Sequence, residues 1–142
     1  MGTMQYCTSE WQNWVLGEEE VIIHIKASYD VGINTFDTAD TYSNGLSDVI
    51  LGNAIKKLSL PRDEIVVTTK VYRVVGRTLS EKLSKPGVRL DELGYVNQRG
   101  LSRKHIFASI KGVCNLIMLM LSCLSRPGVR LKIVLTTILS CF

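Results

Sequence analysis

The chain has 142 residues, of which 46% are hydrophobic and 21% charged, with 17 Lys and Arg against 13 Asp and Glu. This length corresponds to one domain at most, and the composition excludes disordered, collagen-like and low-complexity proteins. The net charge of +4 is too small to indicate a nucleic-acid partner without a concentrated basic patch, and we predict none.

The first half of the chain predicts a helix, a short strand and a second helix. The acidic run 18–20 stands where a helix dipole is positive, apolar residues follow at helical spacing, and Gly32 suits the left-handed position after a helix. Residues 33–37 then predict a short strand. Ser47 is expected to cap a second helix that Pro61 ends. The core stripe of that helix is Leu51, Ala54, Ile55 and Leu58.

The next segments predict a strand, a long loop and a third helix. Residues 64–70 are rich in β-branched side chains and are typical of a buried strand. Residues 71–101 form a loop longer than an ordinary connection, which indicates a functional or mobile segment. Ser102 is expected to cap a helix with Ile106, Ile110 and Val113 on one face. Alternating strands and helices predict an α/β fold with a parallel sheet, whose strand ends share one edge where reactive groups collect.

Residues 114–142 differ in character from residues 1–113. From residue 115 on they hold three basic residues, Arg126, Arg130 and Lys132, and no acidic one. Their apolar runs are interrupted and do not reach the ~18 residues that span a bilayer, so a membrane anchor is the weaker interpretation of the tail. We therefore predict two parts, a folded domain over 1–113 and a divergent apolar and basic tail over 114–142.

The four cysteines have no CxxC spacing and no metal-binding spacing with His24 or His105, so we predict no metal site. We interpret them as free thiols in a reducing compartment, which predicts a cytoplasmic protein. They are Cys7, Cys114, Cys123 and Cys141.

Three residues could carry chemistry at the expected edge of the sheet. As the last residues of adjacent parallel strands, Asp37 and Lys70 would bring a carboxylate and an ammonium group together, and Tyr42 follows five positions after Asp37. An ammonium group stabilises a nearby phenolate, and a carboxylate orients that ammonium group. The three residues therefore predict a proton-donating relay for a carbonyl oxygen. A structural ion pair beside a packed loop tyrosine is the simpler alternative, and spacing alone does not decide.

Several motifs resemble the aldo-keto reductase family. Residues 32–42, with 44–47 after them, resemble the family's signature around its second strand, and residues 66–70 resemble its third strand. Residues 100–106 are similar to the branch that contains aryl-alcohol-dehydrogenase-like enzymes and potassium-channel β subunits, and residues 2–4 resemble the end of the first strand.

The resemblance implies a (β/α)8 TIM barrel, of which this chain carries the first three or so βα units. It also implies NADP as the cofactor and small-molecule aldehydes, ketones or alcohols as substrates of hydride transfer. By position, Tyr42 would be the general acid, Lys70 the cation that stabilises its phenolate, and Asp37 the residue that holds Lys70. Thr3, Met4 and Asp37 would bind the cofactor, although Met4 stands where many relatives have tryptophan.

The same resemblance implies a truncated member of the family. The chain has no counterpart of the fourth catalytic position or of the later strands that supply most pyrophosphate and adenine contacts. His105 does not substitute for that position, because it belongs to a helix-start motif and is expected to lie on the surface. Binding of NADP by this chain is therefore expected to be weak or absent, and the sequence leaves open whether the chain is an enzyme.

Two alternatives remain beside an NADP-dependent oxidoreductase fragment that reduces carbonyls or oxidises alcohols. The first is a non-catalytic regulatory or binding fragment like a channel β subunit. The second is a truncated product without an independent function. Oligomerisation is left open under each of them.

Overall fold

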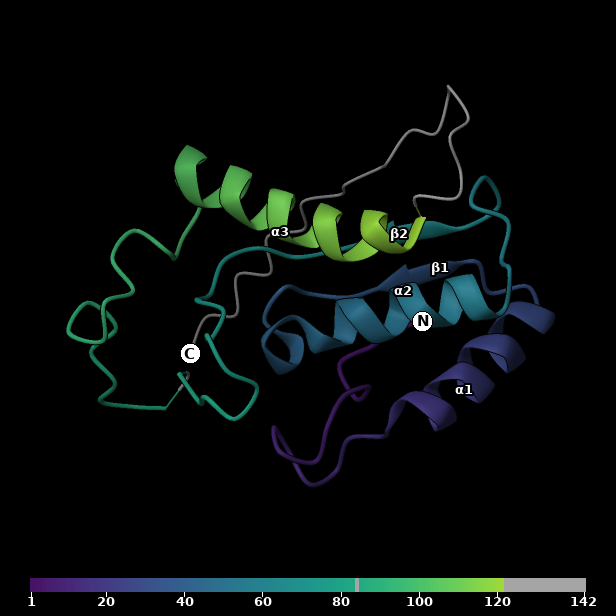
Figure 1. Cartoon of the computed structure of the whole chain (residues 1–142), viewed down its shortest axis with the longest axis horizontal. Helices are drawn as coiled ribbons and strands as arrows, with labels where there is room; N and C mark the ends of the chain where they lie inside the picture. The colour runs from purple at the N-terminus through teal and green to yellow at the C-terminus, as the bar shows by residue number, and fades with distance from the viewer. Residues whose placement is uncertain (84, 122–142) are drawn as a thin grey trace.

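The computed structural model describes residues 1–83 and 85–121 of the chain (Figure 1). Its elements are α1 (Glu18–Asp30), β1 (Thr35–Asp37), a 3₁₀ turn (Tyr42–Gly45), α2 (Leu46–Lys57), β2 (Val66–Thr68) and α3 (Arg103–Leu121). The alternation of helices and strands confirms the predicted α/β class. The predicted tail beyond Leu121 lies outside the described residues, and the division at residue 113 stays a prediction.

The two strands are parallel neighbours, as the sequence predicts. Phe36 of β1 pairs with Val67 of β2, and Asp37 pairs with Thr68. The first residues of the chain lie on the other side of β1, where Gly2 forms a parallel bridge with Asp37. Residues 2–4 therefore lie beside β1. This is the position in which the resemblance to a barrel predicts the end of the family's first strand, with β1 as the family's second strand.

The predicted strand ends are wrong at both strands. The regular pairing of β1 begins at Thr35 rather than at residue 33, and β2 ends at Thr68 rather than at Lys70. The segments nevertheless stay adjacent beyond the ladder, because the Asp40 amide donates to the Lys70 carbonyl oxygen over 3.3 Å. Lys70 thus lies two positions beyond the last paired residue of β2, but it remains at the same edge of the sheet as Asp37.

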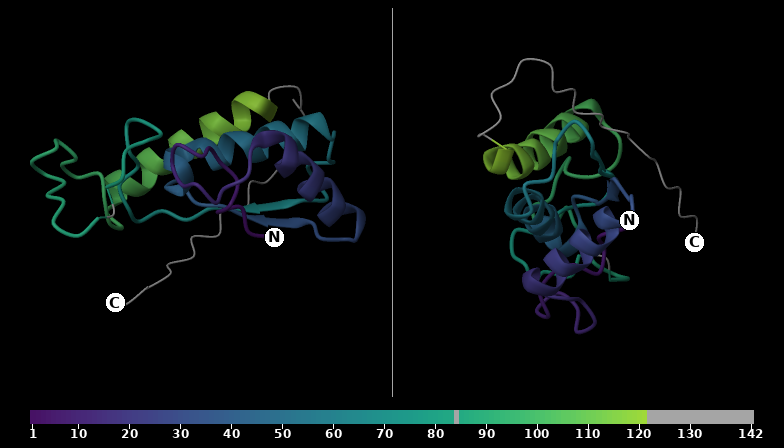
Figure 2. Two further views of the ribbon diagram at one scale, coloured as in Figure 1. Left: turned by 90° about the horizontal axis from the view of Figure 1, so that it is seen from below. Right: turned by 90° about the vertical axis from the view of Figure 1, so that its right-hand side faces the viewer.

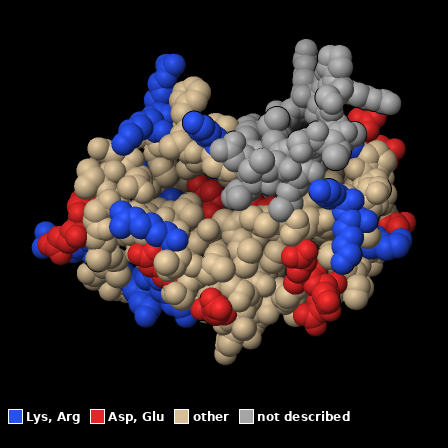
Figure 3. Space-filling view, viewed as in Figure 1, with Lys and Arg blue, Asp and Glu red and all other residues tan. Residues whose placement is uncertain are grey.

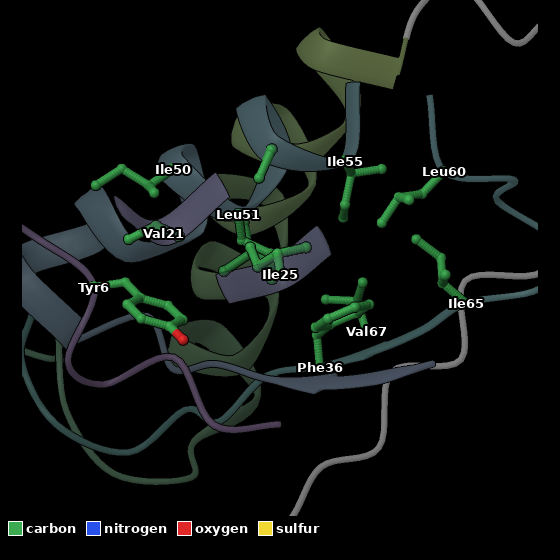
Figure 4. Packing of buried hydrophobic residues seen from close by; sticks show 12 residues of the cluster. Tyr6, Val21, Ile25, Phe36, Ile50, Leu51, Ile55, Leu60, Ile65 and Val67 are labelled. Carbon is green, nitrogen blue, oxygen red and sulfur yellow. The ribbon is translucent and has the colours of Figure 1, made fainter. Parts of the chain in front are cut away.

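The core lies on one face of this small sheet (Figure 4). Phe36 and Val67 point toward the helices and are 0% and 5% exposed, whereas Thr35 on the other face is exposed. Burial of an aliphatic or aromatic side chain contributes about 1.5–3 kcal/mol, so this cluster is the main stabilising term. Its members are Tyr6, Val21, Ile25, Phe36, Ile50, Leu51, Ala54, Ile55, Leu60, Ile65, Val67 and Val113.

Helix α2 is confirmed, but the predicted cap at its start is wrong. The residue before the helix is Gly45, with a φ of 95°, and Ser47 lies inside the first turn. The Ser47 hydroxyl donates to the Thr3 carbonyl oxygen over 2.9 Å instead of capping the helix. The helix ends at Lys57, before Pro61, where Ser59 adopts a φ of 50°.

The ends of the other two helices follow the predicted signals. Gly32, just after α1, has a φ of 90°. At the start of α3 the His105 amide donates to the Ser102 hydroxyl oxygen over 3.2 Å, which confirms Ser102 as the cap. The expected surface position of His105 is wrong: its side chain is 5% exposed, because the capped turn directs it into the protein.

Helices α2 and α3 lie on the same side of the strands (Figure 2, left). The segment 71–101 contains no helix or strand in its described part, as predicted, and extends beyond one end of the helices (Figure 1). On the face that Figure 3 shows, acidic and basic residues are interspersed rather than gathered by sign.

Candidate active site

The structure brings the three predicted residues together. Asp37 ends β1, Tyr42 opens the 3₁₀ turn, and Lys70 follows β2. The Lys70 ammonium group forms an ion pair with Asp37 Oδ2 and lies 3.4 Å from the Tyr42 hydroxyl oxygen. The relay that the spacing predicts is therefore assembled in space, although its role in catalysis stays a prediction.

The ion pair is held from several sides. Lys70 Nζ also donates to the Thr38 carbonyl oxygen over 3.0 Å, and Thr68 Oγ1 donates to Asp37 Oδ1 over 2.9 Å. The Lys70 side chain is 16% exposed and that of Asp37 is 43% exposed. Because the ammonium group is largely removed from water while the carboxylate remains open to it, Lys70 is the fixed member of the pair.

Tyr42 completes the arrangement from the turn before α2. Its ring centroid lies 5.2 Å from Lys70 Nζ, and its side chain is half-buried. A contact of 3.4 Å is at the long limit of a hydrogen bond, and such contacts shorten in many enzymes only when a substrate is bound. The half-buried Tyr42 therefore lies beside the ammonium group at the end of the two strands.

The two other predicted contacts differ in exposure. Thr3 is fully buried, and its hydroxyl group donates to the Asp37 carbonyl oxygen over 3.2 Å while it accepts from Ser47 over 3.0 Å. Met4 is 46% exposed. Thr3 thus fixes the backbone of Asp37, and Met4 offers an apolar side chain to the solvent. Their contact with a cofactor stays a prediction.

Sequence reasoning missed two buried carboxylates next to this site. Burial raises the pKa of the Asp40 carboxyl from 3.8 to about 7, and the charge of Asp48 adds to the rise. Burial also raises the pKa of Asp48, to about 6, although the Thr38 hydrogen bond and the Lys70 charge oppose it. Asp40, which ends the segment 37–40, and Asp48, at the start of α2, were visible in the sequence, but their burial was not.

Asn44 ties the site to the long loop, which was also missed. Its Nδ2 donates to the carbonyl oxygens of Thr78 and Glu81 over 2.7 and 3.0 Å, and its Oδ1 accepts from the Gly76 amide over 2.9 Å. A side chain at Gly76 would come within 2.6 Å of Asn44. The turn that carries Tyr42 is therefore tied to residues 76–81 of the long loop.

The residues present fit one end of an NADP molecule. The Asp37 carboxylate is partly open and retains acceptor capacity beyond its two bonds, which suits a ribose hydroxyl group. The exposed Met4 suits a flat apolar ring. No group of three or more potential metal ligands was found in the part of the chain that the structure describes.

A comparison with the sequence patterns of known families identifies one family. The sequence model that describes the aldo/keto reductase family matches residues 1–117 of this chain. The chain belongs to the aldo/keto reductase family.

Two of the relatives are fungal proteins. The chain is 43% identical over 110 residues to versiconal hemiacetal acetate reductase of Aspergillus parasiticus, which covers 78% of this chain and 32% of that protein. It is 42% identical over 112 residues to a Saccharomyces cerevisiae protein named provisionally as an aryl-alcohol dehydrogenase. That alignment covers 78% of this chain and 33% of the yeast protein. The chain therefore spans about a third of the length of these curated relatives.

Solved structures support the same fold. An aldo-keto reductase of Bacillus halodurans, in its holo form, aligns with a TM-score of 0.56 and 22% identity over 83% of this chain and 31% of that one. The described residues thus form part of a TIM barrel, as predicted. No helix in this part of the chain is long and apolar enough to cross a membrane.

Proposed function

We propose that this chain carries the proton-donating part of an NADP-dependent carbonyl reductase. The observation that supports the proposal is the Lys70 ammonium group, which contacts Asp37 and lies 3.4 Å from the Tyr42 hydroxyl oxygen. A phenol that lies beside a fixed cation is placed to act as a general acid toward a bound carbonyl oxygen. Membership of an oxidoreductase family supports the same chemistry.

In this mechanism Tyr42 donates its hydroxyl proton to the oxygen of a small aldehyde or ketone. The Lys70 ammonium group stabilises the phenolate that remains, and Asp37 keeps Lys70 in place through their ion pair. NADPH, when bound, supplies the hydride that adds to the carbonyl carbon, so the products are an alcohol and NADP⁺. In the reverse direction the Tyr42 phenolate would accept the proton of an alcohol.

Asp37 and Met4 would hold the nicotinamide end of the cofactor, while Thr3 supports Asp37 from behind. The chain spans about a third of its relatives, so cofactor binding by this chain alone is expected to be weak. A cytoplasmic location, inferred from the cysteine pattern, belongs to the same proposal. Burial raises the pKa of the Cys7 thiol to about 12, which is consistent with an unreactive cysteine.

The test is the oxidation of NADPH by the whole chain in the presence of 4-nitrobenzaldehyde, at a cofactor concentration high enough to offset weak binding. Tyr42→Phe should abolish the reaction, and Lys70→Met should lower its rate by about 10²-fold or more. Tyr72→Phe is the matched control, because Tyr72 is 59% exposed on the long loop. Equal rates in the Tyr42 and Tyr72 variants, or no reaction of the parent chain, would refute the proposal.

A further inference from the structure

Asp48 is connected to the Lys70 ammonium group through a single residue. It lies in the first turn of α2 and is fully buried, and its Oδ1 accepts a hydrogen bond of 2.7 Å from Thr38 Oγ1. The carbonyl oxygen of the same Thr38 accepts the 3.0 Å hydrogen bond from Lys70 Nζ. The side chain of Thr38 thus holds the carboxylate while its backbone holds the ammonium group.

Thr38 has little freedom to move between these two partners. It is fully buried, and its amide donates to the Thr68 carbonyl oxygen over 2.9 Å. A threonine hydroxyl has one proton to donate, and here Asp48 accepts it. The contact with Asp48 is therefore one of the restraints on Thr38, whose carbonyl oxygen binds Lys70 Nζ.

The charges of Asp48 and Lys70 are coupled as well. Asp48 Oδ2 is buried and has no hydrogen-bond partner among the described residues. A buried carboxylate in this condition is costly unless a nearby cation balances it. The Lys70 charge is the cation that lowers the pKa of Asp48. Asp48 is therefore joined to Lys70 both through the hydrogen bonds of Thr38 and through this charge interaction.

We propose that Asp48 is a positioning residue: through Thr38 and through its own charge it holds the Lys70 ammonium group beside Tyr42. The inference rests on the proposed role of Tyr42 as proton donor. Protonation of Asp48 at acid pH removes the attraction and weakens the Thr38 contact, so the relay is best ordered when Asp48 is ionised.

Other titratable groups lie near Asp48 and Lys70 or on helix α3, which packs against α2. Asp37 is paired directly with Lys70, and Asp40 faces Asp48 from the segment after β1, where Ser109 of α3 donates a hydrogen bond to it. His105 of α3 has its pKa lowered by burial and is neutral near pH 7. The competing titration is therefore that of Asp40, which the experiment must remove.

The experiment is a carbon NMR titration of aspartate carboxyl groups in the whole chain, without cofactor and with Asp40→Asn in every variant. Lys70→Met should raise the midpoint of Asp48 from about 6 by about one unit. Thr38→Val, which removes the hydroxyl donor at nearly constant volume, should also raise it. Lys56→Met, at an exposed position in the last turn of α2, is the control and should leave it unchanged. An unchanged midpoint in both test variants would overturn the proposal.

The pH dependence of NADPH-driven carbonyl reduction provides the second measurement. With Asp40→Asn in every variant, the rate should fall below about pH 6 in the chain that retains Asp48 and in Asp48→Glu, whereas Asp48→Asn should lose this step. A step of the same size in Asp48→Asn would also overturn the inference. If the parent chain reduces no carbonyl at any pH, the proposed function fails, while the NMR titration still decides whether Asp48 senses Lys70.

Discussion

Replacement of Asp40 by asparagine should stabilise the protein at neutral and alkaline pH. Asp40 is 5% exposed, and its Oδ2 has no hydrogen-bond partner among the residues that the structure describes. Burial raises the pKa of its carboxyl from 3.8 to about 7. Between these values the folded chain retains a proton that the unfolded chain releases, so the free energy of unfolding falls as the pH rises through this range.

The magnitude follows from the size of that rise. One pKa unit corresponds to about 1.4 kcal/mol, so a rise of about three units costs on the order of 4 kcal/mol above pH 7. Asparagine retains an acceptor for Ser109 but buries an amide group without a partner, which costs about 1–3 kcal/mol. We expect Asp40→Asn to be more stable than the parent chain by about 1–3 kcal/mol near pH 8, and this advantage should shrink by about 3 kcal/mol near pH 5.

Urea denaturation followed by circular dichroism, repeated at several pH values, measures this difference. Asp63→Asn is the matched control, because Asp63 is exposed, and its effect should be small at every pH. A difference between Asp40→Asn and the parent chain that stays constant from about pH 5 to pH 8 would refute the reasoning, because the linkage between burial and protonation would then be absent.

Three further substitutions test the packing around the site. Ile25→Ala should lower the free energy of unfolding by about 2–5 kcal/mol in urea denaturation, whereas Ile23→Ala, at 66% exposure on the same helix, should change it by about 0.5 kcal/mol or less. In Asn44→Gly, glycine can adopt the φ of 51° at this position, but the three hydrogen bonds of the Asn44 side chain are lost. Amide hydrogen exchange in segment 71–101 should therefore accelerate by about tenfold or more. Unchanged exchange would contradict the role of Asn44. Ser102→Ala should cost about 1 kcal/mol through loss of the cap of α3, and no change in the urea midpoint would contradict it.

The arrangement of Asp37 and Lys70 was predictable because parallel neighbouring strands leave few alternatives for the residues at their ends. A strand alternates its side chains with a period of two, so the apolar Phe36 and Val67 fix which face is buried and which face carries Asp37. The predicted end of β2 was two residues too late, but the predicted proximity of Asp37 and Lys70 was still correct. The reason is that the backbone of Lys70 remains hydrogen-bonded to that of Asp40.

The buried carboxylates were not predictable in the same way. Asp48 stands in the first turn of a helix, where an acidic side chain normally lies in water and interacts with the helix dipole. Its burial follows from the contact with Thr38 and from the packing of α3 on α2, and neither is encoded in the local pattern. Ser47 is a similar case, because Gly45 starts the helix and leaves the serine free to bond Thr3.

The candidate site can form in about a third of the length of the relatives because it needs few contacts that are distant in sequence. Asp37, Tyr42 and Lys70 belong to two consecutive strands and the turn between them, and the core that holds these strands lies on the opposite face, at Phe36 and Val67. A dinucleotide is much longer than this group of side chains. We therefore expect tight binding of a dinucleotide to need contacts along more of the sheet edge than these two strands provide. We therefore expect proton donation and cofactor affinity to be separable in this fold, because the proposed positioning of Lys70 by Asp48 involves no cofactor.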